Sequence, residues 1–322
     1  MENKKSQGLQ LRDLSSLLKR FGLLFVLILM FLVMTIVSDV FLTTNNIINV
    51  LRQISINGVL AVGLTFVILT GGIDLSVGSL VAVTSVIAGN LLEKEMNVPL
   101  VLFLSIGAAV LFGVFNGVLI SYFMLPPFIA TLATQTIGRG FSLVYSDGRP
   151  YTIKNEMYKA IGKGVFIGIP IPVWIMFFVI VIALITLRRT TFGRHVYAFG
   201  GNRNAAKLSG VKIRQTEMAT YIISALCAGL AGTILSARIS SGQPTAGEGY
   251  ELDAIAAVAI GGTSMAGGTG HLGGTILGFI IIGVLSNSLT ILNVSSFYQD
   301  IVKGFIIIFA VLMDMRTKRS ER

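Results

Sequence analysis

The sequence predicts an all-α, polytopic membrane protein, and three observations support this fold class. The chain is 53% hydrophobic and only 12% charged, whereas charged residues make up about 25% of a typical soluble domain. Its mean hydropathy is +0.81. The basic residues behind the net charge of +10 gather beside apolar runs rather than among aromatic residues, so we expect a membrane protein with no nucleic-acid partner.

Ten apolar runs are candidates for membrane-spanning helices, each of which needs about 20 mostly apolar residues. They cover residues 21–38, 52–71, 75–92, 99–123, 128–144, 171–187, 217–238, 251–267, 272–292 and 298–314. Arg139 interrupts the fifth run and glycines end the eighth. We therefore expect about ten transmembrane helices, some of them broken.

Three clusters of Lys and Arg, in residues 1–20, 188–214 and 316–322, predict the orientation. Basic loops stay in the cytoplasm, and the predicted spans place all three clusters on that side if the N-terminus starts there. We expect a multi-pass protein of the bacterial cytoplasmic (inner) membrane with both termini in the cytoplasm. Residues 145–170 and 240–251 then form loops on the outer side.

The predicted spans also divide the chain into parts. Residues 1–20 form a cytoplasmic N-terminal segment whose leucines fall on one helical face. This pattern fits a helix on the membrane surface and fits a plain basic flank equally well. Residues 21–314 form the transmembrane domain, which contains the cytoplasmic loop 188–216, and residues 315–322 form a cytoplasmic tail.

Two segments, 61–89 and 254–283, share one plan. Each is an apolar run of small residues, a glycine-rich break and a second apolar run that ends in glycine. Both first runs are predicted to cross from outside to inside, which suggests a parallel pseudo-repeat of two halves, a plan known in transporters.

The sequence carries no pattern typical of an enzyme or a metal site. It contains no GxxxxGK[ST] nucleotide-binding motif, and two histidines and one cysteine far apart cannot hold zinc. The GxGxxG match at Gly268–Gly273 lacks the βαβ context of a dinucleotide site. Because Cys227 is the only cysteine, no disulfide forms within the chain. We expect no catalytic residue, no metal and no cofactor bound by this chain.

The stretch TGGIDLSVGS places a carboxylate inside an apolar region. Gly71 and Gly72 are predicted to end one helix, and Asp74 to cap the next by accepting hydrogen bonds from the N–H groups of Ser76 and Val77. A proton-coupling carboxylate is the alternative role for Asp74.

Polar residues inside apolar runs either line an aqueous path or join helices to one another. The candidates for the translocation path or for helix breaks are Asn57, Asp74, Ser76, Asn116, Thr131, Gln135 and Asn287.

The loop 188–216 contains NRNAAKLSG, which predicts a short helix capped by Asn202 or Asn204 and closed by Gly210. A short amphipathic helix that projects from a membrane bundle suits docking into the groove of a partner. An ordinary solvated loop is the alternative.

Five motifs, in order, resemble a known family. They are LTGGIDLSVGS, FIATLAT, FGRHVYAFGGNRNAAKLSGV, QPTAGEGYELDAIAAVAIGGTSMAGG and NVSSFYQDIVKG. From about residue 20 to the tail the chain resembles the permeases of bacterial carbohydrate ABC importers, in the branched-chain amino acid and ribose permease superfamily. The resemblance implies alternating access and three partners: a second copy of the chain, a cytoplasmic ATPase with two fused nucleotide-binding modules that holds ATP and Mg²⁺, and an extracytoplasmic sugar-binding protein.

The resemblance also assigns residues. It implies ATPase contacts for Gly201, Asn202, Ala205, Ala206, Ser209 and Gly210. The stretch Gln243–Asp253 is expected on the side that faces the binding protein.

The motifs favour D-ribose as the sugar and leave other pentoses, hexoses and a furanosyl signalling compound open. An ion-coupled sugar carrier that uses Asp74 is a distant alternative. His271 departs from the arginine that the family carries at this position, which puts a contact there in doubt.

Overall fold

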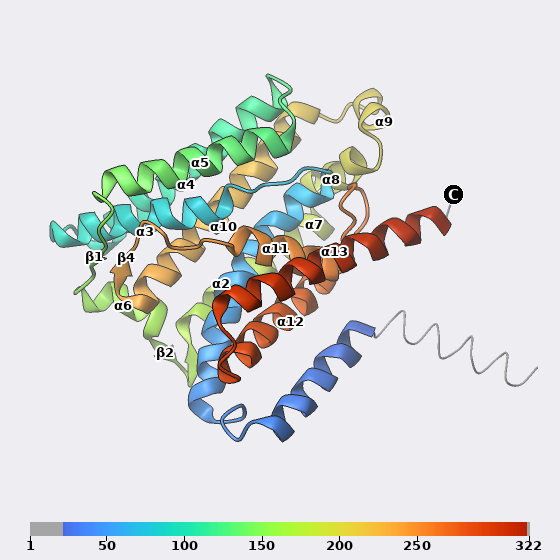
Figure 1. Ribbon diagram of the computed structural model, residues 1–322. Coiled ribbons are helices and arrows are strands. Elements are labelled where there is room, and N and C mark those ends of the chain that lie inside the picture. The colour runs from blue at the N-terminus through green and yellow to red at the C-terminus, as the bar shows by residue number, and fades with distance from the viewer. Residues whose placement is uncertain (1–21, 321–322) are drawn as a thin grey trace, which may run out of the picture.

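The computed structural model describes residues 22–320, and these residues form a bundle of helices with only short strands (Figure 1). The predicted N-terminal segment 1–20 lies outside the described residues. A first helix covers Gly22–Val37. The remaining elements are α2 (Thr44–Leu69), α3 (Val77–Glu93), α4 (Val98–Ser121), α5 (Pro127–Tyr145), β1 (Tyr151–Thr152), α6 (Glu156–Lys163), β2 (Val165–Phe166), β3 (Ile169–Pro170), α7 (Ile171–Arg189), α8 (Thr191–Gly201), α9 (Arg203–Leu208), α10 (Ile213–Ile239), β4 (Ser241–Gly242), α11 (Tyr250–Ile260), α12 (Leu272–Ile291) and α13 (Ser296–Ser320).

A helix of the described chain falls within or overlaps each of the ten predicted spans. Five helices, α2, α4, α7, α10 and α12, are long and apolar enough to cross a membrane, and the first helix and α3 are shorter apolar helices. These helices support an all-α membrane protein, and the count of about ten spans stays a prediction. The helix α13 continues through residues 315–320 of the predicted tail.

The long helix α10 is the axis of the bundle, since α2, α3 and α4 all pack against it. Its N-terminal end lies near α9, and its C-terminal end lies near α6 and β4 (Figure 1). The strands pair as two small antiparallel ladders, β1 with β4 and β2 with β3. The Lys303 ammonium lies 3.0 Å from Asp253 Oδ1 and holds α13 against α11.

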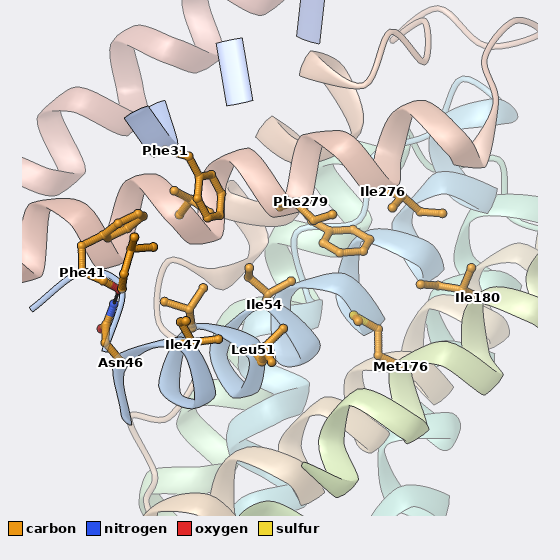
Figure 2. Close-up of a pocket in the computed structure, with 14 residues that line it drawn as sticks. Phe31, Phe41, Asn46, Ile47, Leu51, Ile54, Met176, Ile180, Ile276 and Phe279 are labelled. Atoms are coloured by element: carbon orange, nitrogen blue, oxygen red, sulfur yellow. Dashed lines mark hydrogen bonds between the residues drawn. The ribbon is translucent and has the colours of Figure 1, made fainter. Parts of the chain in front are cut away.

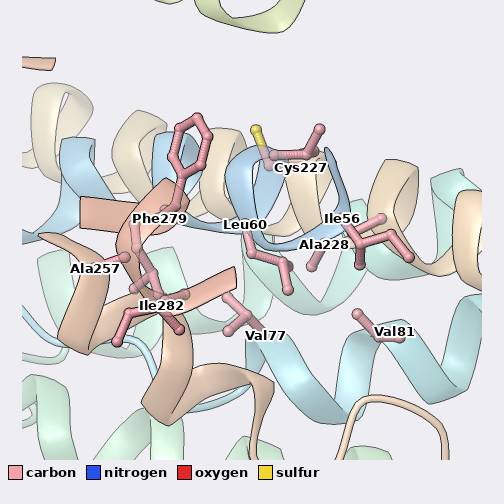
Figure 3. Packing of buried hydrophobic residues seen from close by; sticks show 14 of the residues in the cluster. Ile56, Leu60, Val77, Val81, Cys227, Ala228, Ala257, Phe279 and Ile282 are labelled. Atoms are coloured by element: carbon pink, nitrogen blue, oxygen red, sulfur yellow. The ribbon is translucent and has the colours of Figure 1, made fainter. Parts of the chain in front are cut away.

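The core lies where α2, α3, α10, α11 and α12 meet. Figure 3 shows part of it, including Leu60, Val81, Ala228 and Phe279, all of which are buried. The sequence has GxxxG spacing at Gly113–Gly117 and at Gly274–Gly278, and both pairs serve close packing. Gly113 lies against Ala225 of α10, and Gly278 lies against the backbone of Ala257 in α11.

The predicted eighth span, 251–267, is wrong in its extent, because the helix ends at Ile260. Gly262 adopts a left-handed backbone with φ +77°. Its N–H and that of Thr263 bond back to the carbonyls of Ala259 and Val258, the arrangement that closes a helix at a glycine. The helix α11 therefore has 11 residues and is about 16 Å long.

The predicted loop 240–251 is non-helical up to Gly249, and part of it runs along α3. Gly242 lies against Gly89, and Gly247 lies against Val81 and the carbonyl oxygen of Gly78. The N–H of Gln243 donates to Ser85 Oγ at 3.1 Å. The missing side chains of Gly242 and Gly247 allow this close approach, which apolar periodicity alone does not predict.

Candidate functional site

The site is built around the break between α2 and α3. The helix α2 ends at Leu69 because Gly71 is left-handed, with φ +78°, and the N–H groups of Gly71 and Gly72 bond back to Ile68 and Val67. The helix α3 begins at Val77 with Ser76 as its N-cap. Asp74 is therefore not the capping residue that the sequence predicts: its Oδ1 accepts from the N–H of Ser76 at 3.0 Å, two residues before the helix.

Asp74 belongs to a buried hydrogen-bond network that joins three helices to the break. Its Oδ1 accepts from Ser76 Oγ at 2.6 Å, and its Oδ2 accepts from Ser224 Oγ of α10 at 2.7 Å. Asn116 of α4 donates to Ser76 Oγ at 3.0 Å, and Thr134 of α5 donates to Asn116 Oδ1 at 2.6 Å. All five side chains are buried, so the network holds the non-helical backbone in place.

The other predicted path residues lie apart from this network. Thr131 donates to the carbonyl of Pro127 in its own helix at 2.8 Å, and its hydroxyl lies 3.3 Å from the carbonyl oxygen of Ile73 in the break. Gln135 donates to Glu251 Oε1 of α11 at 2.9 Å.

Two more candidates lie in α2 and α12. Asn287 forms two hydrogen bonds with Asn46, one in each direction, and these bonds join α12 to α2. Asn57 is buried within α2. Ser224 and Asn46 have partners that are distant in sequence, and only the fold brings them together, so no local pattern marks either residue.

The second break, residues 261–271, lies directly against the first. The N–H of Gly268 donates to the carbonyl of Leu69 at 2.9 Å, and a Cβ on Gly267 would lie 2.7 Å from the nitrogen of Gly71. Both first runs of the proposed pseudo-repeat thus end at the same place. The repeat itself stays a prediction, since α2 has 26 residues and α11 has 11.

The end of α8 completes this contact. A Cβ on Gly200 would overlap both the carbonyl oxygen of Leu69 and the nitrogen of Gly268. A Cβ on Gly268 would lie 2.6 Å from the Cα of Gly201. Backbone therefore meets backbone among Leu69–Gly71, Gly200–Gly201 and Ala266–Gly268, which together we call the glycine junction.

Tyr197 of α8 adds a side-chain contact beside the glycine junction. Its hydroxyl donates to the carbonyl of Gly270 at 3.0 Å. Burial raises the pKa of the Tyr197 phenol above its ordinary value, partly offset by Arg188, so the hydroxyl stays protonated as a donor at neutral pH. His271 follows at the N-cap of α12, exposed to solvent.

The short helix predicted in the loop is present as α9. Asn202 caps it by accepting from the N–H of Ala205 at 2.9 Å. Gly210 closes it with φ +83°, and the N–H groups of Gly210 and Val211 bond back to Lys207 and Ala206. Asn202, not Asn204, is therefore the cap.

The outer face of α9 is open. Of the six residues that the resemblance implies as contacts, Gly201, Asn202, Ala205, Ser209 and Gly210 are exposed and Ala206 is buried. Leu208 is 89% exposed, which is unusual for a large apolar side chain on a short, well-capped helix.

One face of α10 connects α9 to the first break. Arg203 Nη2 of α9 lies 3.3 Å from Glu217 Oε2. Tyr221, one helical turn further, packs its hydroxyl against Gly72, and Ser224 binds Asp74. The spacing i, i+4, i+7 puts Glu217, Tyr221 and Ser224 on the same face of the helix.

The chain also has a cavity of about 250 Å³ between the first helix, α2, α7 and α12 (Figure 2). Its lining includes Phe31, Ile54, Met176 and Phe279, and its polar member, Asn46, is paired with Asn287. A polyhydroxylated solute needs hydrogen-bond partners when it leaves water, so this cavity suits apolar chains and not a sugar.

Comparison with known proteins gives one family and several relatives. Residues 46–311 match the family described as branched-chain amino acid transport system / permease component. The chain is 46% identical to the ribose import permease protein RbsC of Bacillus subtilis, over 93% of this chain and 94% of that protein. It is 44% identical to RbsC of Haemophilus influenzae, over 89% and 90%. It is 34% identical to the L-arabinose permease AraH of Azospirillum brasilense, over 95% and 90%. No solved structure matches.

Replacing Asp74 tests whether the network holds the break. Asp74→Ala removes the acceptor of three hydrogen bonds, each worth about 1–3 kcal/mol when a buried partner is left unpaired. We expect this variant to lose its folded form at a clearly lower temperature in detergent, measured by size-exclusion chromatography after heating. Asp74→Asn keeps an acceptor for Ser76 and lets Ser224 accept instead of donate, so it should stay close to wild type. Equal stability of the Ala variant would contradict this role.

Proposed function

The chain belongs to the family of permease components of branched-chain amino acid transport systems, and we propose that it is the membrane subunit of an ATP-driven importer of a monosaccharide, with D-ribose as the sugar. It is an integral inner-membrane transport component, not an enzyme. The ribose assignment is supported by relatives of about 45% identity over most of the chain that are named ribose import permeases. The arabinose relative, at 34%, supports another pentose as the alternative.

The glycine junction is the observation that carries the mechanism. A soluble partner that binds the exposed face of α9 and then changes conformation would move α8. Gly200 of α8 contacts both breaks. Because the contact is between backbones, no flexible side chain absorbs the displacement. The partner we propose is a cytoplasmic ATPase with two fused nucleotide-binding modules, which holds ATP and Mg²⁺ and closes when ATP binds.

The face of α10 gives a second connection to the same break. Arg203 on α9 is paired with the buried Glu217, and Ser224 on the same face holds Asp74. A displacement of α9 is thus applied to the first break from two sides. Alternating access in this scheme is a shift of the two breaks and of the helices that start there, between two packed arrangements.

A second copy of the chain and an extracytoplasmic sugar-binding protein complete the proposed importer. Binding proteins and ATPases act on opposite sides of a membrane, which requires α9 and both termini in the cytoplasm. This orientation agrees with the basic clusters at 188–214 and 316–322.

An ion-coupled carrier is less well supported by the same geometry. Asp74 accepts hydrogen bonds from Ser76 and Ser224 on both of its oxygens. Asp74 is also buried, and a side chain fixed in this way suits a structural role better than repeated proton transfer.

Reconstitution in liposomes tests the function. With the ATPase, the binding protein and ATP inside the liposomes, we expect accumulation of labelled ribose, and no accumulation without the ATPase. A proton or sodium gradient alone should have no effect. Uptake driven by such a gradient in the absence of the ATPase would contradict the assignment as an ATP-driven importer.

Leu208 tests the docking of the ATPase on α9. A buried leucine contributes roughly 1.5–3 kcal/mol, so Leu208→Glu should weaken association at least about tenfold in copurification from detergent. Leu208→Met, which keeps an apolar side chain of similar size, is the matched control and should copurify normally. Normal ATPase binding by the Glu variant would exclude this face of α9 as the contact.

Gly200 tests transmission through the glycine junction. Gly200→Ala places a methyl group where the backbones of Leu69 and Gly268 lie, so the junction must separate while the exposed face of α9 is unchanged. We expect normal copurification of the ATPase, ATP hydrolysis that no longer responds to the loaded binding protein, and little uptake. Gly273→Ala is the control, since its Cβ would meet open space. If Gly200→Ala transports like Gly273→Ala, the junction does not transmit movement.

A further inference from the structure

A non-helical segment, Gln243–Gly249, crosses the bundle level with the middle of α5. Arg139 Nη1 donates to the carbonyls of Pro244 and Ala246 at 2.8 and 3.1 Å. One turn before Arg139, Gln135 donates to Glu251 at the start of α11. Gln135 and Arg139 lie in the central turns of α5, and the segment also runs beside α3 from Gly89 to Gly78. The predicted spans therefore place the segment within the depth of the membrane and not on its surface.

The side chains of this segment alternate between the two sides. Pro244, Ala246 and Gly247 are buried, whereas Gln243, Thr245 and Glu248 are exposed. We group the three exposed residues with the half-buried Gln135 and Arg139 and the buried Glu251, which add amide, guanidinium and carboxylate groups. We call these six residues the polar stripe.

Large apolar side chains are exposed on α5 and α13 as well. On α5, Ile129 is 56% exposed and Val144 is 81% exposed, and on α13, Phe309 is 66% exposed. Surfaces of that kind face lipid. Irregular backbone and charged side chains at membrane depth are tolerated only where protein or water covers them, so the polar stripe cannot face lipid.

The polar stripe is also connected to the glycine junction. The helix α11 begins at Tyr250, directly after the stripe segment, and ends at Ile260, where the second break starts. That break contains Gly267 and Gly268, which touch the first break and α8. The helix α11, about 16 Å long, therefore runs from the polar stripe to the glycine junction.

We propose that the polar stripe lines the water-filled path of the sugar, with the second copy of the chain forming the opposite wall. This inference rests on the proposed function. Sugar hydroxyls both donate and accept, and the stripe offers both kinds of partner: the exposed carboxylate of Glu248 accepts, the amides of Gln135 and Gln243 do both, and a guanidinium has five N–H donors. The apolar cavity of Figure 2 offers none of this chemistry.

Because Cys227 is the only cysteine and is buried, single cysteines can test water access. In a Cys227→Ala background we would introduce Gln243→Cys or Thr245→Cys into the full complex in liposomes and apply a charged, membrane-impermeant maleimide. Val144→Cys and Phe309→Cys are the controls, since both positions are exposed in the isolated chain and are predicted to face lipid.

We expect both stripe cysteines to react at least about tenfold faster than the two controls, and saturating ribose with the binding protein to slow the reaction of Thr245→Cys. Reaction at the rate of the controls overturns the proposal, and so does a rate that ribose leaves unchanged. Disulfide formation between two copies at Thr245→Cys without any maleimide reaction also overturns it, because the stripe would then be a dry contact.

Glu248→Gln adds a transport readout. Loss of one charged hydrogen bond to the sugar corresponds to about a tenfold change, so we expect ribose uptake to fall by about that factor while ATPase copurification is unchanged. Failure of the wild-type complex to take up ribose would count against the proposed function itself. Normal wild-type uptake with unreactive stripe cysteines would count against the polar stripe alone.

Discussion

The structure depends on one constraint: backbone polar groups buried at membrane depth must find partners inside the protein. The breaks at 70–76 and 261–271 meet this constraint in two ways. In the first break a side chain supplies the partner, since Asp74 accepts from the N–H of Ser76. Between the breaks the backbones pair with each other, through the N–H of Gly268 and the carbonyl of Leu69. Because the hydrogen bonds at the breaks join distant segments, the helices that meet at the first break are held together. They are α2, α3, α4, α5 and α10.

Short sequence patterns predicted those parts of the structure that depend on neighbouring residues, namely helix ends and caps. The glycine pair indicated the end of α2, and the flanking Asn202 and Gly210 indicated α9, because left-handed glycines and side-chain caps act within a few residues of where they stand. The contacts between distant segments could not be predicted in the same way. Ser224 is one of two serines in the apolar helix α10, and only the fold shows that it binds Asp74. The depth of Gln243–Gly249 depends on glycines that allow this segment to approach α3. The periodicity of apolar residues does not predict this approach.

The apolar cavity and the polar stripe, both formed by described residues, have opposite chemistry. The cavity beside the first helix is lined by aromatic and aliphatic side chains, whereas the polar stripe carries charges and amides. Their separation across the bundle is consistent with one side that faces acyl chains and another that faces the solute. The core between them, shown in part in Figure 3, consists largely of small and aliphatic residues of α2, α3, α10 and α12, so the two surfaces are joined by rigidly packed helices.

The glycine junction contains almost no side-chain atoms, and this has a consequence for how such a protein can change over generations. At Gly200 and Gly268 every possible substitution adds atoms where neighbouring backbones already lie, so the connection cannot be adjusted by small steps. The polar stripe is different, because Gln243, Thr245 and Glu248 project into open space and can be exchanged without disturbing the packing. In the proposed scheme, the residues that set sugar specificity are therefore separate from those that couple the permease to the ATPase. The sugar specificity can change in evolution while the coupling to the ATPase stays the same.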